Sequence, residues 1–129
     1  MKNIDKALSE LDRSLGSGRV VTDPDVLESY AVDESEVPPH PPEAVVRVQS
    51  AQDVVNAMRI CAAHEVPVTP RAAGTGRTGG AVPLAGGLLL AFENMNRIKG
   101  IETRDLTAVV EPGVVLGEMM HAVDAALFF

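Results

Sequence analysis

Residues 70–83, PRAAGTGRTGGAVP, place four glycines between two apolar runs. A G-x-G-x-x-G pattern begins at Gly74, and this pattern is usually the fingerprint of a dinucleotide-binding turn. Such a turn must open a helix, because the helix N-terminus faces the pyrophosphate. Here Pro83 and the glycine pair at residues 86–87 follow, and both disfavour a helix interior. The sequence therefore predicts a phosphate-loop composition between two strands.

Charge and composition limit the classes of partner. The chain has 129 residues with 11 Lys and Arg against 18 Asp and Glu, a net charge of −7. Nucleic acid is not an expected partner, because binding its phosphates requires a basic face. The glycine-rich stretch itself carries Arg71 and Arg77 and no acid, so it is the part of the chain that best suits an anion.

The cysteine count and the hydropathy indicate the cellular location to expect for the chain. Cys61 is the single cysteine, so the sequence predicts no disulfide framework and no metal site. Its apolar neighbours predict a buried helix face rather than a reactive thiol. No window has the length of a membrane span and the N-terminus lacks an apolar signal core, so the expected location is the cytoplasm.

Hydrophobic periodicity predicts a mixture of helices and strands. Residues 33–42 contain four prolines and are expected to form an extended connector. Residues 20–21 are too short to assign. Helices are predicted over residues 4–15, from Pro24 toward Tyr30 with Asp23 as N-cap, after Ser50 in a capping-box-like start, and over residues 115–127. Strands are predicted over residues 44–48, 66–69, 87–92, 98–102 and 107–110.

Two further expectations concern the packing of these elements. The helix after Ser50 is expected to bury one face, formed by Val54, Val55, Met58, Cys61 and Ala62. The chain stops at the apolar run 126–129 without a capping glycine, which predicts a fragment of a longer domain. The alternative is a C-terminal segment that is tucked into the core.

The glycine-rich stretch admits two interpretations on its residues alone. In the first it is a nest, whose successive backbone N–H groups converge on phosphate oxygens, with hydroxyl donors from Thr75 and Thr78. In the second it is a surface hairpin without a ligand, and composition leaves the two equal. A degraded P-loop fails, because Arg71 stands where the first glycine belongs and no helix follows.

Residues 66–83 resemble the FAD-pyrophosphate loop of the vanillyl-alcohol-oxidase-type flavoproteins. In that family a strand ends in R-G-x-G-T-x-x-x-G-G and is followed by another strand. The resemblance extends to residues 42–46, 94–98 and 110–114, with a weaker match of Tyr30 and Asp33 to the N-terminal arm of the family. The members that this chain most resembles are the flavin subunit of glycolate oxidase and the D-lactate and D-2-hydroxyacid dehydrogenases.

This resemblance implies an α+β fold, namely a partial FAD-binding (PCMH-type) domain with a small mixed sheet and flanking helices. It implies a helical arm and proline-rich connector over residues 1–41, a first FAD-binding subdomain over residues 42–113, and the start of a second subdomain over residues 114–129. Glu111, which precedes Pro112 at a sharp corner, is expected to anchor that corner rather than to act as a catalytic acid.

The resemblance also implies which residues bind the cofactor. Main-chain groups of Ala73–Gly76 and of Gly79 and Gly80 would contact the FAD pyrophosphate, and Arg71 would brace the loop. A non-covalent flavin is implied, because Thr75 stands where covalent relatives carry histidine. Two departures are Ala72 in place of glycine and Arg77 in place of an apolar residue. The whole implied set is Arg71, Ala72, Ala73, Gly74, Thr75, Gly76, Gly79, Gly80, Pro112 and Gly113, with no catalytic and no metal-binding residue.

For function, the resemblance implies a flavin-dependent oxidoreductase that oxidises glycolate or D-2-hydroxyacids such as D-lactate to 2-oxoacids. This chain would hold the adenine–pyrophosphate half of FAD and is expected to be inactive alone. The implied partners are a small 2-hydroxyacid and an electron-transfer subunit, through which the protein could associate with a membrane. The alternatives are a stand-alone FAD-binding or subunit-interaction module, a UDP-N-acetylenolpyruvoylglucosamine-reductase-like flavoprotein, and a decayed reading frame.

Overall fold

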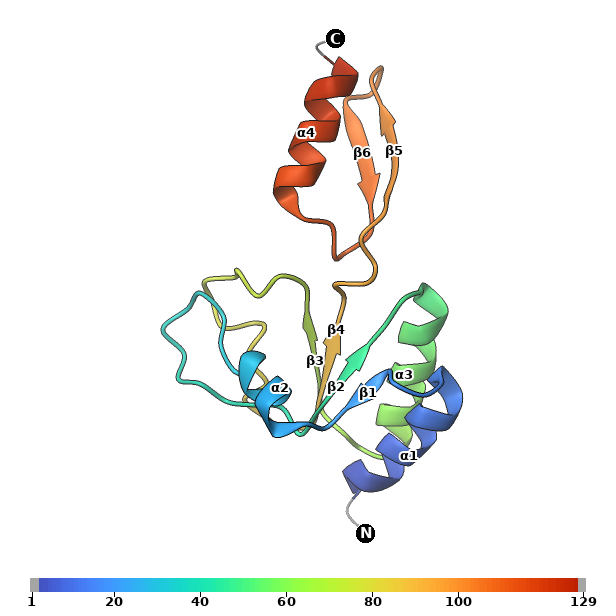
Figure 1. Cartoon of the computed structure of the whole chain (residues 1–129), viewed down its shortest axis with the longest axis vertical. Coiled ribbons are helices and arrows are strands. Elements are labelled where there is room, and N and C mark those ends of the chain that lie inside the picture. The colour runs from blue at the N-terminus through green and yellow to red at the C-terminus, as the bar shows by residue number, and fades with distance from the viewer. Residues whose placement is uncertain (1–2, 128–129) are drawn as a thin grey trace.

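The structure is a computed structural model that describes residues 3–127. Two bodies are stacked along its long axis, the lower one containing a sheet with three helices and the upper one a hairpin with one helix (Figure 1). The elements are α1 (Asn3–Leu15), β1 (Val20–Val21), α2 (Pro24–Ser29), β2 (Ala44–Arg47), α3 (Ala51–Ala63), β3 (Val68–Arg71), β4 (Leu88–Ala91), β5 (Ile98–Glu102), β6 (Thr107–Val110) and α4 (Leu116–Leu127).

The lower body is built on a four-stranded sheet in the order β1-β2-β4-β3. Strands β2, β4 and β3 run parallel, whereas β1 pairs antiparallel with β2. All four residues of β4 are buried, as the apolar run predicts for a central parallel strand. Burying a leucine side chain contributes about 1.5–3 kcal/mol, so Leu88, Leu89 and Leu90 are major sources of stability. The carboxyl ends of the three parallel strands meet at one edge.

Helices cover both faces of this sheet (Figure 1). Helices α1 and α3 pack on each other and on one face, where Leu11, Val46 and Leu90 belong to the main core. On the other face, Val45 and Leu89 pack with Leu27 of α2. The N-terminal elements therefore contribute to the same core as the strands, while the division into residues 1–41, 42–113 and 114–129 stays a prediction.

Helix α3 begins at a side-chain cap. The Ser50 hydroxyl accepts a hydrogen bond from the backbone N–H of Asp53 at 3.1 Å, as predicted. The Asp53 carboxylate does not complete a capping box with the N-cap residue. It accepts from the backbone N–H of Gln49 and from Arg19, each at 2.8 Å. The start of α3 is thus tied to Arg19, the residue directly before β1.

The predicted buried face of α3 is confirmed at Cys61 and at the partly buried Val54, and it is wrong at Val55, Met58 and Ala62. Val55 and Met58 are 40% and 46% exposed, whereas Ala57 and Ile60 are buried. The helix carries apolar residues on more than one stripe, and the sheet together with α1 selects the stripe of small and branched residues. Cys61 is buried as predicted, and burial raises the pKa of its thiol to about 11.

The upper body consists of the antiparallel β5–β6 hairpin with α4 beside β5. Both strands have the predicted bounds, and α4 begins one residue later than predicted. Within residues 3–127, no helix combines the length and hydropathy that crossing a membrane requires. The predicted run 126–129 ends in residues that lie outside the described range.

Candidate cofactor site

The glycine-rich loop leaves the carboxyl end of β3 at Arg71 and returns to the start of β4 at Leu88. No helix lies between these two residues, so the predicted strand–loop–strand arrangement is confirmed. The loop projects from the edge at which the parallel strands end (Figure 1). In open α/β sheets, ligands bind outside this edge.

The backbone N–H groups of residues 72–80 form a continuous run of unused donors. Among the described residues 3–127, no protein acceptor receives a hydrogen bond from any of them. Buried N–H groups are almost always paired, so an unpaired run faces solvent or a ligand. Successive N–H groups in a turn form a concavity that suits phosphate oxygens, as the nest interpretation expects.

Gly74 and Gly79 serve the packing of the chain itself. Their φ values are +70° and +81°, a left-handed backbone that side chains other than glycine rarely adopt. A Cβ at Gly74 would lie 2.2 Å from Nη2 of Arg71, and one at Gly79 would lie 2.5 Å from Cγ2 of Val37. Ala72 does not have a positive φ, so its methyl group is compatible with the backbone.

Gly76 and Gly80 leave open space instead. A Cβ at Gly80 would meet nothing within 4 Å, and one at Gly76 would meet only Oδ2 of Asp33, at 4.0 Å. Neither residue has a positive φ. Within the loop, these are the two glycines whose missing side chains leave room for a ligand.

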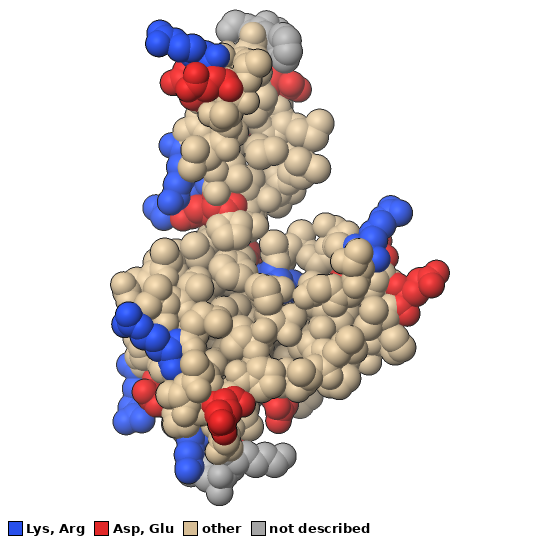
Figure 2. Space-filling view, turned by 180° about the vertical axis from the view of Figure 1, so that it is seen from behind, with Lys and Arg blue, Asp and Glu red and all other residues tan. Residues whose placement is uncertain are grey.

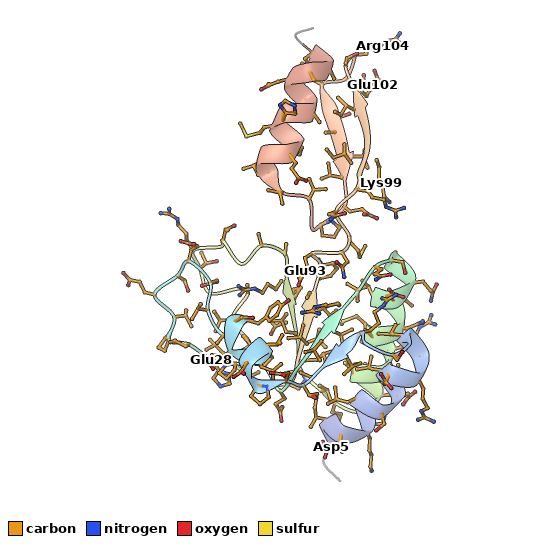
Figure 3. All side chains as sticks on the ribbon, in the orientation of Figure 1. Asp5, Glu28, Glu93, Lys99, Glu102 and Arg104 are labelled. Carbon is orange, nitrogen blue, oxygen red and sulfur yellow. The ribbon has the colours of Figure 1, made fainter. Side chains whose placement is uncertain are left out.

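Arg71 lies against the loop and ties it to the N-terminal arm, in keeping with the predicted brace. Its Nη1 donates a hydrogen bond to the carbonyl oxygen of Val32, and its guanidinium lies 5.5 Å from the centroid of the Tyr30 ring. The Tyr30 hydroxyl donates to the carboxylate of Glu93, which follows β4 (Figure 3). Burial raises the pKa of Tyr30, and the hydrogen bond to Glu93 adds to this effect.

Asp33 limits where an anion can lie. Its Oδ1 accepts from the backbone N–H of Ser35 at 2.9 Å, whereas its Oδ2 is buried without a partner among the described residues. The Ser35 hydroxyl is the main cause that lowers the pKa of Asp33, and the charge of Arg71 adds to it. Because a carboxylate repels phosphate, the open space beside Gly80 suits an anion better than the space beside Gly76.

An open groove of about 610 Å³ lies between the connector and the tip of the loop. It is lined by Glu34, Ser35, Glu36, Val37, Pro38, Arg77 and Thr78. Two of these residues are acidic, so the groove is a poorer phosphate site than the unpaired N–H groups. On the face that Figure 2 shows, acidic and basic side chains are spread over both bodies, and the bodies join at a narrow waist.

The corner after β6 lies at this waist. The backbone N–H of Gly113 donates to the carbonyl oxygen of Met95 at 2.8 Å, and a Cβ at Gly113 would lie 1.9 Å from the carbonyl oxygen of Phe92. The side chain of Glu111 is buried and accepts from the backbone N–H of Arg97 at 2.9 Å and from its guanidinium at 2.8 Å. Arg97 lowers the pKa of Glu111 to about 2, so Glu111 anchors the corner as predicted.

Phe92 links the two groups of predicted site residues. Its N–H donates to the carbonyl oxygen of Arg71 at 3.0 Å, and its own carbonyl oxygen lies against Gly113. The start of the loop and the corner that contains Pro112 are therefore both attached to the end of β4. Sequence reasoning did not anticipate Phe92 or Val37, since neither belongs to a glycine or charge pattern.

Comparisons with known proteins agree with this geometry. Residues 42–129 match the protein family described as FAD binding domain. The glycolate oxidase subunit GlcD of Bacillus subtilis (strain 168) is 40% identical over 88 residues, which are 68% of this chain and 19% of that protein. D-2-hydroxyglutarate dehydrogenase of Stutzerimonas stutzeri (strain A1501) is 32% identical over 123 residues, or 95% of this chain and 26% of that protein.

A solved structure extends the likeness to the whole fold. The crystal structure of p-cresol methylhydroxylase with substrate bound aligns with a TM-score of 0.84 and 28% identity, over 96% of this chain and 25% of that chain. The chain belongs to the FAD-binding-domain family of flavin-dependent oxidoreductases, and FAD is the cofactor of this family. The predicted resemblance and the α+β class are thereby confirmed. The chain spans only about a fifth to a quarter of the length of these relatives.

Proposed function

We propose that this chain holds the adenine–pyrophosphate half of FAD without a covalent bond. The observation that carries the proposal is the run of unpaired backbone N–H groups at residues 72–80, at the carboxyl edge of the sheet. Gly76 and Gly80 leave space beside these donors, which a pyrophosphate needs for close approach. The corner at Pro112 and Gly113, attached through Phe92, would line the cofactor from the other side of the waist.

The side chains of the loop have separate roles in this proposal. The hydroxyls of Thr75 and Thr78 can donate to phosphate oxygens, and the exposed Arg77 can supply positive charge. Thr75 offers no ring nitrogen for attachment, which supports a non-covalent flavin. Arg71 orients the loop through its contacts with Val32 and Tyr30. When bound, FAD supplies the hydride-accepting chemistry, while these residues bind and orient it.

For the complete protein we propose oxidation of glycolate or of D-2-hydroxyacids such as D-lactate to 2-oxoacids. The named relatives support this substrate class, because one is a glycolate oxidase subunit and another a D-2-hydroxyglutarate dehydrogenase. An electron-transfer subunit is a proposed partner, since the first relative is itself a subunit. Mixing the FAD-loaded complete protein with D-lactate, L-lactate and glycolate without oxygen tests the class. Bleaching of the flavin by D-lactate or glycolate is expected, and bleaching by none of these acids would refute it.

The cofactor assignment is tested by titrating the 129-residue chain with FAD, ADP and FMN in a calorimeter. We expect FAD and ADP to compete for one site and FMN to bind far more weakly, because FMN lacks the adenine half. The variants Gly76→Val and Gly80→Val should weaken FAD binding at least about tenfold, since losing one hydrogen bond to a charged group costs about 1.5–3 kcal/mol.

Gly100→Val is the matched control. Gly100 also leaves open space and has no positive φ, but it lies in β5 of the upper body. This variant should bind FAD as the unaltered chain does. Equal FAD affinity in all three variants, or FMN binding as tight as FAD binding, would contradict the assignment. Gly74→Val and Gly79→Val are unsuitable probes, because their side chains would collide with Arg71 and Val37 whether or not FAD is present.

A further inference from the structure

Residues 30–37, which we name the strap, cross the glycine-rich loop on the way from α2 to the proline-rich connector. The strap lies outside residues 42–129, the part of the chain that matches the FAD-binding-domain family. It has no regular secondary structure beyond turns and bends. Its shape is set locally, because Asp33 Oδ1 accepts from the N–H of Ser35 at 2.9 Å and Ser35 Oγ accepts from the N–H of Val37 at 3.2 Å.

The strap supplies the main-chain hydrogen bond that holds the middle of the loop. The backbone N–H of Glu34 donates to the carbonyl oxygen of Gly76 at 3.0 Å. Among the described residues, no other hydrogen bond joins residues 72–80 to a part of the chain outside residues 71–87. Without the strap, the loop would have no main-chain tie between its two strands.

Two side-chain contacts fix the left-handed glycines. Val37 of the strap fills the space beside Gly79, with its Cγ2 at 2.5 Å from the position of an added Cβ. Arg71 fills the corresponding space beside Gly74, and its guanidinium is held in turn by the carbonyl oxygen of Val32 and the ring of Tyr30. Within residues 72–80, each of the two positive-φ positions is therefore backed by the strap, directly or through Arg71.

We propose that the strap is a positioning element for the cofactor, which holds the N–H groups of residues 72–80 in one arrangement before FAD binds. This inference deepens the proposed function and rests on it. Ordering a residue at the moment of binding costs about 1–2 kcal/mol of backbone entropy, and a prearranged loop avoids that cost. Residues of the strap, Val37 above all, thus contribute to the affinity for FAD by holding the loop.

The experiment measures backbone ¹⁵N order parameters of Gly76, Gly79 and Gly80 in the chain without FAD, together with FAD affinity by calorimetry. In the unaltered chain, the loop glycines should be as ordered as rigid backbone, at about 0.85. Val37→Ser and Arg71→Met should lower these values below about 0.6 and weaken FAD binding about tenfold, the equivalent of ordering one residue. Val37→Ile keeps the branched side chain and should restore both quantities.

Glu28→Gln is the control, because the exposed side chain of Glu28 lies in α2, outside both the strap and the groove, and this variant should change neither quantity. A loop that stays ordered in both Val37→Ser and Arg71→Met would refute the proposal that the strap holds the loop in one arrangement. A loop that becomes mobile while FAD affinity stays the same would refute the proposal that the strap contributes to FAD binding. A chain whose loop is ordered by the strap but which binds no FAD would overturn the proposed function, and the order parameters would still support the strap.

Discussion

The glycines of the loop fall into two groups that differ in why a side chain is absent. Gly74 and Gly79 need a left-handed backbone and leave space that the side chains of Arg71 and Val37 fill. Gly76 and Gly80 have ordinary backbone angles and open surroundings. A G-x-G-x-x-G pattern alone cannot tell these cases apart, because both place the same letter in the sequence. Substitution of Gly76 or Gly80 therefore tests ligand binding, whereas substitution of Gly74 or Gly79 disturbs the packing of the chain itself.

The ion pair between Glu111 and Arg97 should make the stability of the chain depend on pH. The pKa of Glu111 is lowered from 4.5 to about 2 by Arg97, so the folded state favours the charged carboxylate. The stabilisation is present above about pH 4.5 and is lost as the pH falls toward 2. Glu111→Gln should therefore melt at a lower temperature than the unaltered chain at pH 6, and the difference should close near pH 2.

The measurement is a series of thermal melts followed by circular dichroism between pH 2 and pH 7. Glu36→Gln is the control, because Glu36 is exposed, lies in no helix and makes no ion pair with any described residue. Its melting temperature should follow that of the unaltered chain at every pH. A Glu111→Gln difference that is the same at pH 2 and pH 6 would show that the ion pair contributes nothing to stability.

At the scale of elements, α3 depends on the cap at Ser50. The Ser50→Ala variant removes the acceptor for the N–H of Asp53 and should lower the free energy of unfolding by about 1 kcal/mol. Urea denaturation followed at 222 nm measures this change. Ser9→Ala in α1 removes an exposed hydroxyl bonded within its own helix and should have little effect. Equal stability of the two variants would mean that the cap is dispensable.

The elements themselves could be predicted from the sequence, whereas their arrangement could not. Apolar runs and turn residues locate β4, β5 and β6 to within a residue or two, since burial selects those runs. The sheet order could not be predicted, because β4 enters between β2 and β3 through long-range pairing. The two residues of β1 form a strand only because β2 offers a free edge. The buried stripe of α3 is likewise decided by its partners.

The candidate site could be predicted only in part, because its composition is local in the sequence whereas the contacts that shape it are not. The composition of residues 72–80 indicates phosphate binding, and the missing helix after it excludes the Rossmann and P-loop types. The contacts that shape the loop come from residues 30–37, far away in sequence and without a motif of their own. Val37 and Phe92 contribute by position, through a side chain over Gly79 and a carbonyl against Gly113. Such roles become visible only once the chain is folded.

In the whole molecule, the candidate site bridges the two bodies. The loop belongs to the lower body, the corner at Pro112 and Gly113 leads into the upper one, and the end of β4 joins them (Figure 1). A cofactor held by both would contact the waist on the side where the loop projects. The span shared with this chain is 19% of the length of one of these relatives and 26% of the length of the other.

If the unpaired N–H groups of residues 72–80 bind the pyrophosphate of FAD, their amide chemical shifts should respond to the cofactor. These shifts can be followed in the ¹⁵N-labelled chain during titration with FAD. The largest changes are expected on residues 72–80, with a second set at Gly113, and ADP should reproduce the first set. Amides of residues 72–80 that keep their shifts at saturating FAD would contradict this binding.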